Sequence, residues 1–242
     1  MEKFLEQWRH FQRALSVHMQ LEDSGLFPLL DSVGNSAVTE AGLGDEHLQD
    51  VKLREAVDKA IGEEDRAALK KAFEAWREYH LEHLTHEEEI MMPIIPKTGN
   101  TCIEHGQAIN QRLFSVIESM DEFDWALGWI LDKLDNATGT SQPADVMVRV
   151  FVWGLHYSAD DKQWQRWLPI VKANVSPERY QQIVDNFRID RPGRIGAITD
   201  IDEEFSYLPA DAPRPMPFAI MRNTHEALRI SISEMRHSLE IV

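Results

Sequence analysis

The sequence predicts an all-α protein, and three observations carry that prediction. Apolar residues recur with a period close to 3.6 along most of the 242-residue chain, which is the spacing of one helix face. No stretch alternates apolar and polar residues as a half-buried strand would. With 43% hydrophobic residues the chain has enough apolar surface for a sizeable core. We therefore expect an up-down four-helix bundle with additional C-terminal helices.

The first half of the chain predicts four helices, which are separated by helix-breaking residues. Proline lacks the N–H that a helix interior needs, so the first helix is expected to end near Pro28 and the third near Pro93. Asp45, after two glycines, caps the second helix, and the turn-like sequence KTGNT precedes the fourth. These helices are expected at about residues 2–28, 45–61, 64–92 and 101–120. Together they predict a metal-binding bundle over residues 1–120.

The second half of the chain predicts a helical extension over residues 121–242. Helical patterns at about 122–135 and 144–168 flank the sequence NATGTSQP, and a short helix begins at Ser176-Pro177. A long loop rich in Pro, Gly and Asp follows at 186–217, and a terminal helix closes the chain at about 218–240. A loop of this length is usually a lid, a linker or an arm. The extension is expected to pack on the same domain or to exchange in a homodimer through its C-terminal helices.

Composition excludes several classes of partner. The chain has 41 Asp and Glu against 25 Lys and Arg, and the net charge of -16 disfavours nucleic acid and anionic membranes. Its single cysteine, Cys102, excludes an internal disulfide or a cysteine metal cage. The N-terminal sequence MEKFLEQWRHFQRAL is a charged amphipathic helix rather than a signal peptide, and no apolar run is long enough to span a membrane. We expect a cytoplasmic protein whose metal would be held by histidines and carboxylates.

Two helices change from apolar to ionisable residues along one inward-facing stripe. In the first helix, the stripe of Phe4, Trp8, Phe11 and Leu15 continues into His18 and Glu22. In the third, the stripe of Phe73 and Trp76 continues into His80, His83 and Glu87. Burying an unpaired carboxylate or imidazole costs several kcal/mol, so these residues need a compensating partner. A metal ion is one such partner, because residues i and i+4 can reach the same ion.

The two stretches are repeats of each other. Each reads His, three residues, Glu, five residues, Pro, and then a loop followed by Glu-His; the second histidines are His47 and His105. Antiparallel neighbours bring these elements to one end of a bundle. The predicted metal ligands are His18, Glu22, His47, His83, Glu87 and His105. Mixed nitrogen and oxygen donors favour iron or manganese. The alternative is that these residues form partly exposed ion pairs.

Other residues are weaker candidates. His80 faces inward enough to be a further ligand or a hydrogen-bond donor beside the site. A third, imperfect copy of the repeat contains His156 with Asp160 and Asp161, and His225 follows the long loop. This copy either replaces members of the first set, pairs with its symmetry mate across a dimer, or is satisfied without metal.

The segments HMQLEDSGLFPLL with DEHLQ, and HLTHEEEIMMPII with IEHGQAI, resemble the hemerythrin-like family of HHE cation-binding domains. The resemblance is clear over residues 1 to about 120 and loose over 145–240. It implies a four-helix bundle that holds a non-haem di-iron centre, with bridging carboxylates and an open position for dioxygen or a similar ligand. Matched residue by residue, the resemblance implies that the iron ligands are His18, Glu22, His47, His83, Glu87 and His105.

The sequence departs from the family pattern in two respects. The family usually opens with a single-histidine helix, whereas this chain opens with a His-x3-Glu helix. The bundle is therefore either the first four helices or the second to fifth, which would use His156 with Asp160 or Asp161. Tyr79 stands where a histidine four residues before His83 would complete the family's pair. The seventh ligand is thus unassigned, and the site is either five-coordinate, completed by His80, or mononuclear.

Three functions are compatible with the sequence. The first is a di-iron protein that binds or senses dioxygen, nitric oxide or peroxide. The second is an oxidase, a peroxidase or an iron-supplying repair enzyme, with a substrate site shaped by Tyr79 or by the 186–217 loop. The third is a metal-free helical interaction module. The sequence leaves open whether the protein is an enzyme and identifies no catalytic residue.

Overall fold

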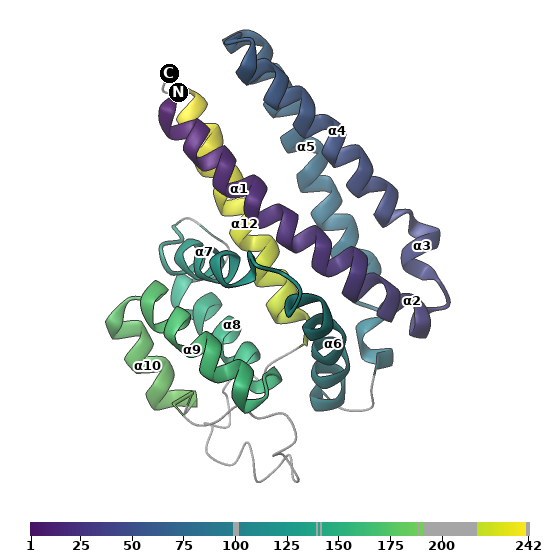
Figure 1. Cartoon of the computed structure of the whole chain (residues 1–242), viewed down its shortest axis with the longest axis vertical. Coiled ribbons are helices and arrows are strands. Elements are labelled where there is room, and N and C mark those ends of the chain that lie inside the picture. Colours follow the sequence, from purple (N-terminus) through teal and green to yellow (C-terminus); the bar gives the residue numbers. More distant parts are fainter. Residues whose placement is uncertain (99–101, 139, 141, 188, 191–216, 241–242) are drawn as a thin grey trace. The chain divides into compact units, whose positions relative to one another are not determined.

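The computed structural model describes the chain except residues 99–101, 139, 141, 188, 191–216 and 241–242. Every regular element within the described residues is helical, as predicted (Figure 1). Most of the predicted loop at 186–217 lies outside the described residues. Within them, no helix has the length and hydropathy that crossing a membrane requires.

The helices fall into two compact units. The first comprises Met1–Thr98 and Ser231–Val242, and the second comprises Gly99–Ile230. The helix at 102–117 belongs to the second unit, where it packs against the helix at 144–158. The end of the terminal helix, in contrast, belongs to the first unit. The domain boundary at residue 120 stays a prediction.

The first unit combines three long helices with the end of the terminal helix. Its regular elements are α1 (Glu2–Leu21), α2 (Phe27–Gly34), α3 (Ala37–Ala41), α4 (Leu43–Gly62), α5 (Arg66–Met91), the 3-10 helix Ile95–Thr98 and the C-terminal end of α12 (Pro217–Glu240). The connection between α4 and α5 is short, and the side chain of Asp65 caps α5 by accepting the N–H groups of Ala67 and Ala68. The two helices pack as an antiparallel pair (Figure 1).

The first helix does not end at Pro28 as predicted. A π-helical turn, Glu22–Leu26, joins α1 to α2, and the Phe27 N–H donates to the Glu22 carbonyl. Pro28 lies in the first turn of α2, where its missing N–H costs little. The helical path therefore continues to Gly34 and stops at Asn35, which adopts a left-handed conformation with φ 55°.

An aromatic core fills one end of the first unit. Phe4, Trp8 and Phe11 of α1 and Phe73 and Trp76 of α5 are all at most 2% exposed. Edge-to-face pairs connect the two helices, with ring centroids 4.8 Å apart for Trp8 and Trp76 and 5.4 Å apart for Phe4 and Phe73. Such pairs add about 0.5–1.5 kcal/mol each beyond area burial. The apolar stripes thus face inward, as their spacing predicted.

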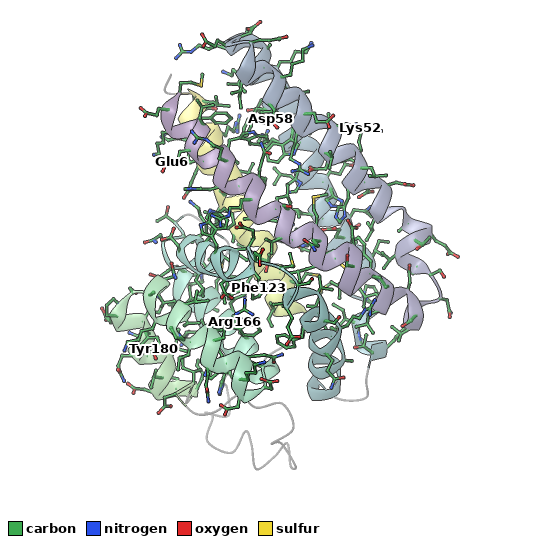
Figure 2. The ribbon with its side chains drawn as sticks, viewed as in Figure 1. Glu6, Lys52, Asp58, Phe123, Arg166 and Tyr180 are labelled. Carbon is green, nitrogen blue, oxygen red and sulfur yellow. The ribbon has the colours of Figure 1, made fainter. Side chains whose placement is uncertain are left out.

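Polar contacts bring the end of α12 alongside α1 and α5. The Ser238 hydroxyl donates to the Gln7 side chain at 2.8 Å, and Arg236 pairs with Glu74 at 3.1 Å. Asp58 of α4, labelled in Figure 2, accepts the Trp8 indole N–H at 2.7 Å. The end of α12 thus lies beside α1 and α5 in the first unit.

The second unit is built from shorter helices around tryptophan side chains. Its helices are α6 (Cys102–Ile117), α7 (Phe123–Asp135), α8 (Ala144–Ser158), α9 (Asp161–Asn174), α10 (Pro177–Phe187) and the first part of α12. Phe123 packs on Trp167 with 5.6 Å between ring centroids, and Arg166 pairs with Asp124 at 3.0 Å; Figure 2 labels Phe123 and Arg166.

The single helix predicted at 144–168 is in fact two helices. Asp160 adopts an extended conformation and accepts the Gln163 N–H at 2.8 Å, while the Gln163 side chain accepts the Asp160 N–H at 2.8 Å. This reciprocal capping box satisfies two backbone donors and starts α9 afresh after α8 ends.

Candidate metal centre

Five ionisable side chains are buried together in the first unit. His18 lies in the last turn of α1 and Glu22 opens the π-helical turn. His47 lies near the start of α4, and His83 and Glu87 lie one turn apart near the end of α5. All five are at most 8% exposed, and Glu87 is fully buried. Such burial in ionisable form requires compensating charge or hydrogen bonds.

One donor group is formed by α4 and α5. The Glu87 Oε1 atom lies 3.0 Å from His83 Nε2 and 3.2 Å from His47 Nε2. The candidate ligand atoms of these three residues all lie within 4.8 Å of one another. Two imidazoles and one carboxylate at this separation can bind a single cation.

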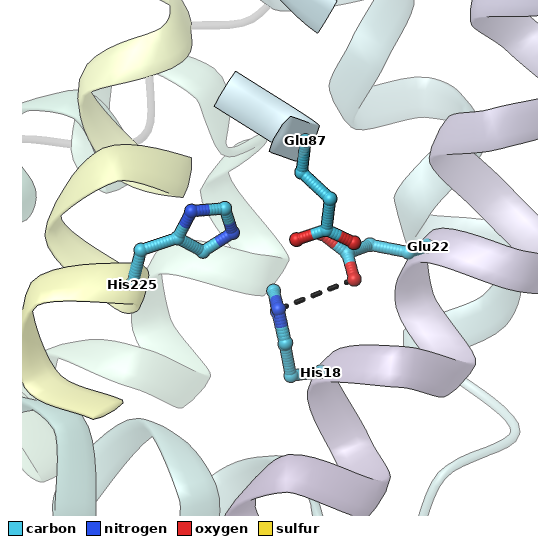
Figure 3. A group of neighbouring side chains, drawn as sticks. All are labelled: His18, Glu22, Glu87 and His225. Atoms are coloured by element: carbon cyan, nitrogen blue, oxygen red, sulfur yellow. Dashed lines mark ion pairs between the residues drawn. The ribbon is translucent and has the colours of Figure 1, made fainter. Parts of the chain in front are cut away.

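A second donor group extends to α1 and shares Glu87 with the first. His18 Nε2 lies 3.2 Å from Glu22 Oε2, and Figure 3 shows this ion pair together with Glu87. Candidate ligand atoms of His18, Glu22 and Glu87 also lie within 4.8 Å of one another. Glu22 in turn approaches the first group, with 3.6 Å between its Oε2 and His47 Nε2. The two donor groups thus have the Glu87 carboxylate in common.

The remaining ring nitrogens of the histidines are held by acidic side chains. His47 Nδ1 lies 2.8 Å from Asp23, and His83 Nδ1 lies 2.7 Å from Glu46. An ionised carboxylate only accepts hydrogen bonds, so Nδ1 of each histidine carries the hydrogen that is donated to it. Nε2 of each ring faces Glu87. Carboxylate partners of this kind fix the orientation of metal-binding histidines. Asp23 and Glu46 were missed from the sequence, although each directly precedes or follows a predicted ligand.

The negative charge of these carboxylates makes the site favour a cation. Burial lowers the pKa of His47, but its interactions with Asp23, Glu22 and Glu87 outweigh burial and raise that pKa to about 12. Burial is likewise outweighed at His83, where Glu87 and Glu46 raise the pKa of the imidazole. In the absence of a metal ion, protons on His47 and His83 supply the positive charge.

The stability of the metal-free protein is expected to fall as pH rises. Because the folded-state pKa of His47 is about 12 against 6.5 in the unfolded chain, its contribution is complete below pH 6.5 and is lost progressively as the pH rises from 6.5 toward 12. The slope is at most about 1.4 kcal/mol per pH unit for each such histidine. Urea unfolding with a chelator at about pH 6.5 and 9 measures it. A His47→Gln protein should show a shallower dependence, and an unchanged slope in that variant would contradict the assignment.

Three further histidines were predicted as site residues: His80, His105 and His225. His80 is buried beside the site, with Nδ1 2.9 Å from Asp50. His105 belongs to α6, but its side chain lies outside the described residues. His225, also drawn in Figure 3, belongs to the second unit, and its part in a metal site stays a prediction.

The third copy of the repeat has other local roles in the structure. His156 is buried with its ring 4.7 Å from that of Trp164, Asp160 caps α9, and Asp161 accepts the Gln165 side chain at 3.1 Å. No donor group found among the described residues includes these three predicted ligands. Their binding of metal therefore stays a prediction.

An open groove of about 710 Å³ includes His83 in its lining. Its lining residues are mostly acidic or aromatic, and they include one member of the donor groups, His83. They are Glu46, Tyr79, Glu82, His83, Thr85, His86 and Glu89. The Glu46 carboxylate contacts two histidines of this lining, because it accepts from His83 Nδ1 at 2.7 Å and from His86 Nδ1 at 2.8 Å. The groove therefore offers a polar, negatively charged approach to one histidine of the site.

Histidine and glutamate donors buried between packed helices are typical of helical proteins that bind cations. Residues 1–95 match the family model of the hemerythrin HHE cation binding domain. The resemblance predicted from the sequence is thus confirmed over this range, which includes His18, Glu22, His47, His83 and Glu87 and ends before His105. No curated protein and no solved structure gives a significant match to the chain.

Proposed function

We propose that the protein is a non-haem di-iron protein that binds or senses dioxygen, nitric oxide or peroxide. The observation that carries the proposal is the position of Glu87, whose carboxylate belongs to both donor groups. A carboxylate shared by two cation positions is the arrangement by which helical bundles hold paired metal ions. Glu22 supports the same arrangement, since it contacts His18 and approaches His47.

The chemistry of the donors supports iron, with manganese as the alternative. Within the first unit, one group offers two imidazoles and one carboxylate, and the other offers one imidazole and two carboxylates. Such mixed nitrogen and oxygen sets suit borderline divalent ions better than calcium, which prefers oxygen alone, or a thiolate zinc site. Iron held there would supply the redox chemistry and the ligand binding, while the protein supplies orientation through Asp23 and Glu46.

The metal content of a His18 variant tests the dinuclear proposal. Wild-type protein purified without chelators should carry about two irons per chain, and His18→Ala should carry about one, because His47, His83 and Glu87 remain. His10→Ala, an exposed histidine of the same helix, is the matched control. Metal analysis with the visible spectrum before and after admission of air gives the result. Less than one metal per wild-type chain would contradict the proposal and favour a metal-free interaction module.

An enzymatic function is the second candidate, and the groove beside His83 favours it. An oxidase, peroxidase or iron-repair enzyme needs room for a substrate next to its metal, and Tyr79 lines that groove together with His83. The candidate predicts turnover of peroxide or an organic substrate by the iron-loaded protein. A double Glu22→Ala, Glu87→Ala variant should lose this turnover, and unchanged turnover there would exclude it.

A further inference from the structure

His80 is a buried histidine of the first unit that neither donor group uses. It is 1% exposed and lies one turn before His83 on α5, with 6.1 Å between the two ring centroids. Histidine and carboxylate donors stand about 2.0–2.2 Å from an ion such as zinc, so the ligands of one ion lie within about 4.4 Å of each other. Among the described residues, His80 is absent from the groups whose atoms lie within 4.8 Å. The structure thus places it beside the centre rather than in it.

The tautomer of His80 is fixed by Asp50. Its Nδ1 atom lies 2.9 Å from Asp50 Oδ1, which also accepts the Trp76 indole N–H at 2.9 Å. Arg54 donates to the other Asp50 oxygen at 2.7 Å. The carboxylate is therefore ionised and accepts on both oxygens, so His80 Nδ1 must carry the hydrogen. Nε2 of the neutral ring is consequently a bare acceptor.

This acceptor lies in apolar surroundings. The His80 ring stacks on Trp76 at 5.3 Å and meets the edge of Phe11 at 5.7 Å. No hydrogen-bond partner for its Nε2 atom is found in the part of the chain that the structure describes. A buried acceptor without a partner is costly, so a persistent one points to a group that arrives from outside the chain.

We propose that His80 is a positioning residue whose Nε2 accepts a hydrogen bond from a protonated oxygen of a small ligand, such as water or hydrogen peroxide, at the adjacent metal centre. The inference rests on the proposed function and deepens it, because it gives the ligand a required feature: an O–H donor. The Asp50 carboxylate orients the acceptor, and the rings of Trp76 and Phe11 flank the imidazole.

The test compares iron content with the rate of reaction with hydrogen peroxide. His80→Phe keeps an aromatic ring beside Trp76 and Phe11 but removes the hydrogen-bond acceptor, whereas His80→Gln keeps an acceptor oxygen. His10→Phe, at an exposed site, is the control. All variants should carry the wild-type amount of iron. Stopped-flow absorbance should show a reaction slowed about tenfold or more in His80→Phe and largely restored in His80→Gln.

Three results would overturn the inference. Loss of iron in His80→Phe would make His80 a ligand, and an unchanged peroxide rate would make it structural. Iron-free wild-type protein would overturn the proposed function as well, and the iron analysis identifies that case. If His80→Phe fails to fold, a measurement on the wild-type protein replaces it. The ¹⁵N NMR spectrum of the iron-free protein should show that Nε2 of His80 is unprotonated. A protonated Nε2 would contradict the assignment.

Discussion

Replacing Glu87 by glutamine should reduce bound iron to about one-tenth of the wild-type amount or less. The effect is larger than that of losing an ordinary ligand, because Glu87 belongs to both donor groups. The amide keeps the size of the side chain but removes the negative charge that faces His47 and His83. Metal analysis of protein purified in iron-rich medium measures the change.

The matched control for this substitution is Glu78→Gln. Glu78 is exposed on the same helix and lies outside both donor groups. The Glu78→Gln protein should retain its full iron content. Any loss of iron in Glu87→Gln then reflects the site rather than the overall charge of the chain. Retention of both irons by Glu87→Gln would show that the two cation positions do not depend on a shared carboxylate.

Replacing Asp50 by alanine should destabilise the protein by about 3–5 kcal/mol. Burial alone would raise the pKa of Asp50, but hydrogen bonds from His80 and Arg54 outweigh it and lower that pKa, so the group is ionised at neutral pH. Its removal leaves the Arg54 guanidinium, the His80 imidazole and the Trp76 indole without their acceptor. Urea unfolding of the metal-free proteins measures the change in free energy.

Glu55→Ala is the control for the Asp50 substitution. Glu55 lies on the same helix but is exposed, and a surface substitution of this kind usually changes stability by no more than about 0.5 kcal/mol. A loss below about 1 kcal/mol in Asp50→Ala would mean that water replaces the carboxylate, which would contradict the burial of the network.

The periodicity of the sequence predicted the inward face of α1 and α5 and, with it, the burial of His18, Glu22, His83 and Glu87. It did so because a helix repeats its faces every 3.6 residues whatever surrounds it. The partners Asp23, Glu46 and Asp50 were not predicted. Their contacts with His47, His83 and His80 join residues 24 to 37 positions apart, and these depend on how α4 lies against its neighbours.

The helices were also easier to predict than their association. The sequence left open whether the bundle is the first four helices or the second to fifth, and both include the 101–120 helix, because short loops favour antiparallel neighbours. In the structure α6 belongs to the second unit, and the end of α12 packs with α1 and α5 through Ser238 and Arg236. Sequence spacing describes each helix face but says little about which face a distant helix will cover. The capping box of Asp160 and Gln163 was visible as a local signal and divides the helix expected at 144–168.

The π-helical turn at Glu22–Leu26 makes the first helix one residue too long for an unbroken α-helical path. The surplus residue changes the rotational phase between the residues before the turn and the residues after it. His18 and Glu22 keep the phase of the aromatic stripe, while Phe27 stacks on the His47 ring at 5.3 Å. Without the surplus residue, the helix beyond the turn would rotate by about 100°. The extra residue thus allows one continuous helical segment to supply the candidate ligands His18 and Glu22 and also the Phe27 ring that stacks on His47.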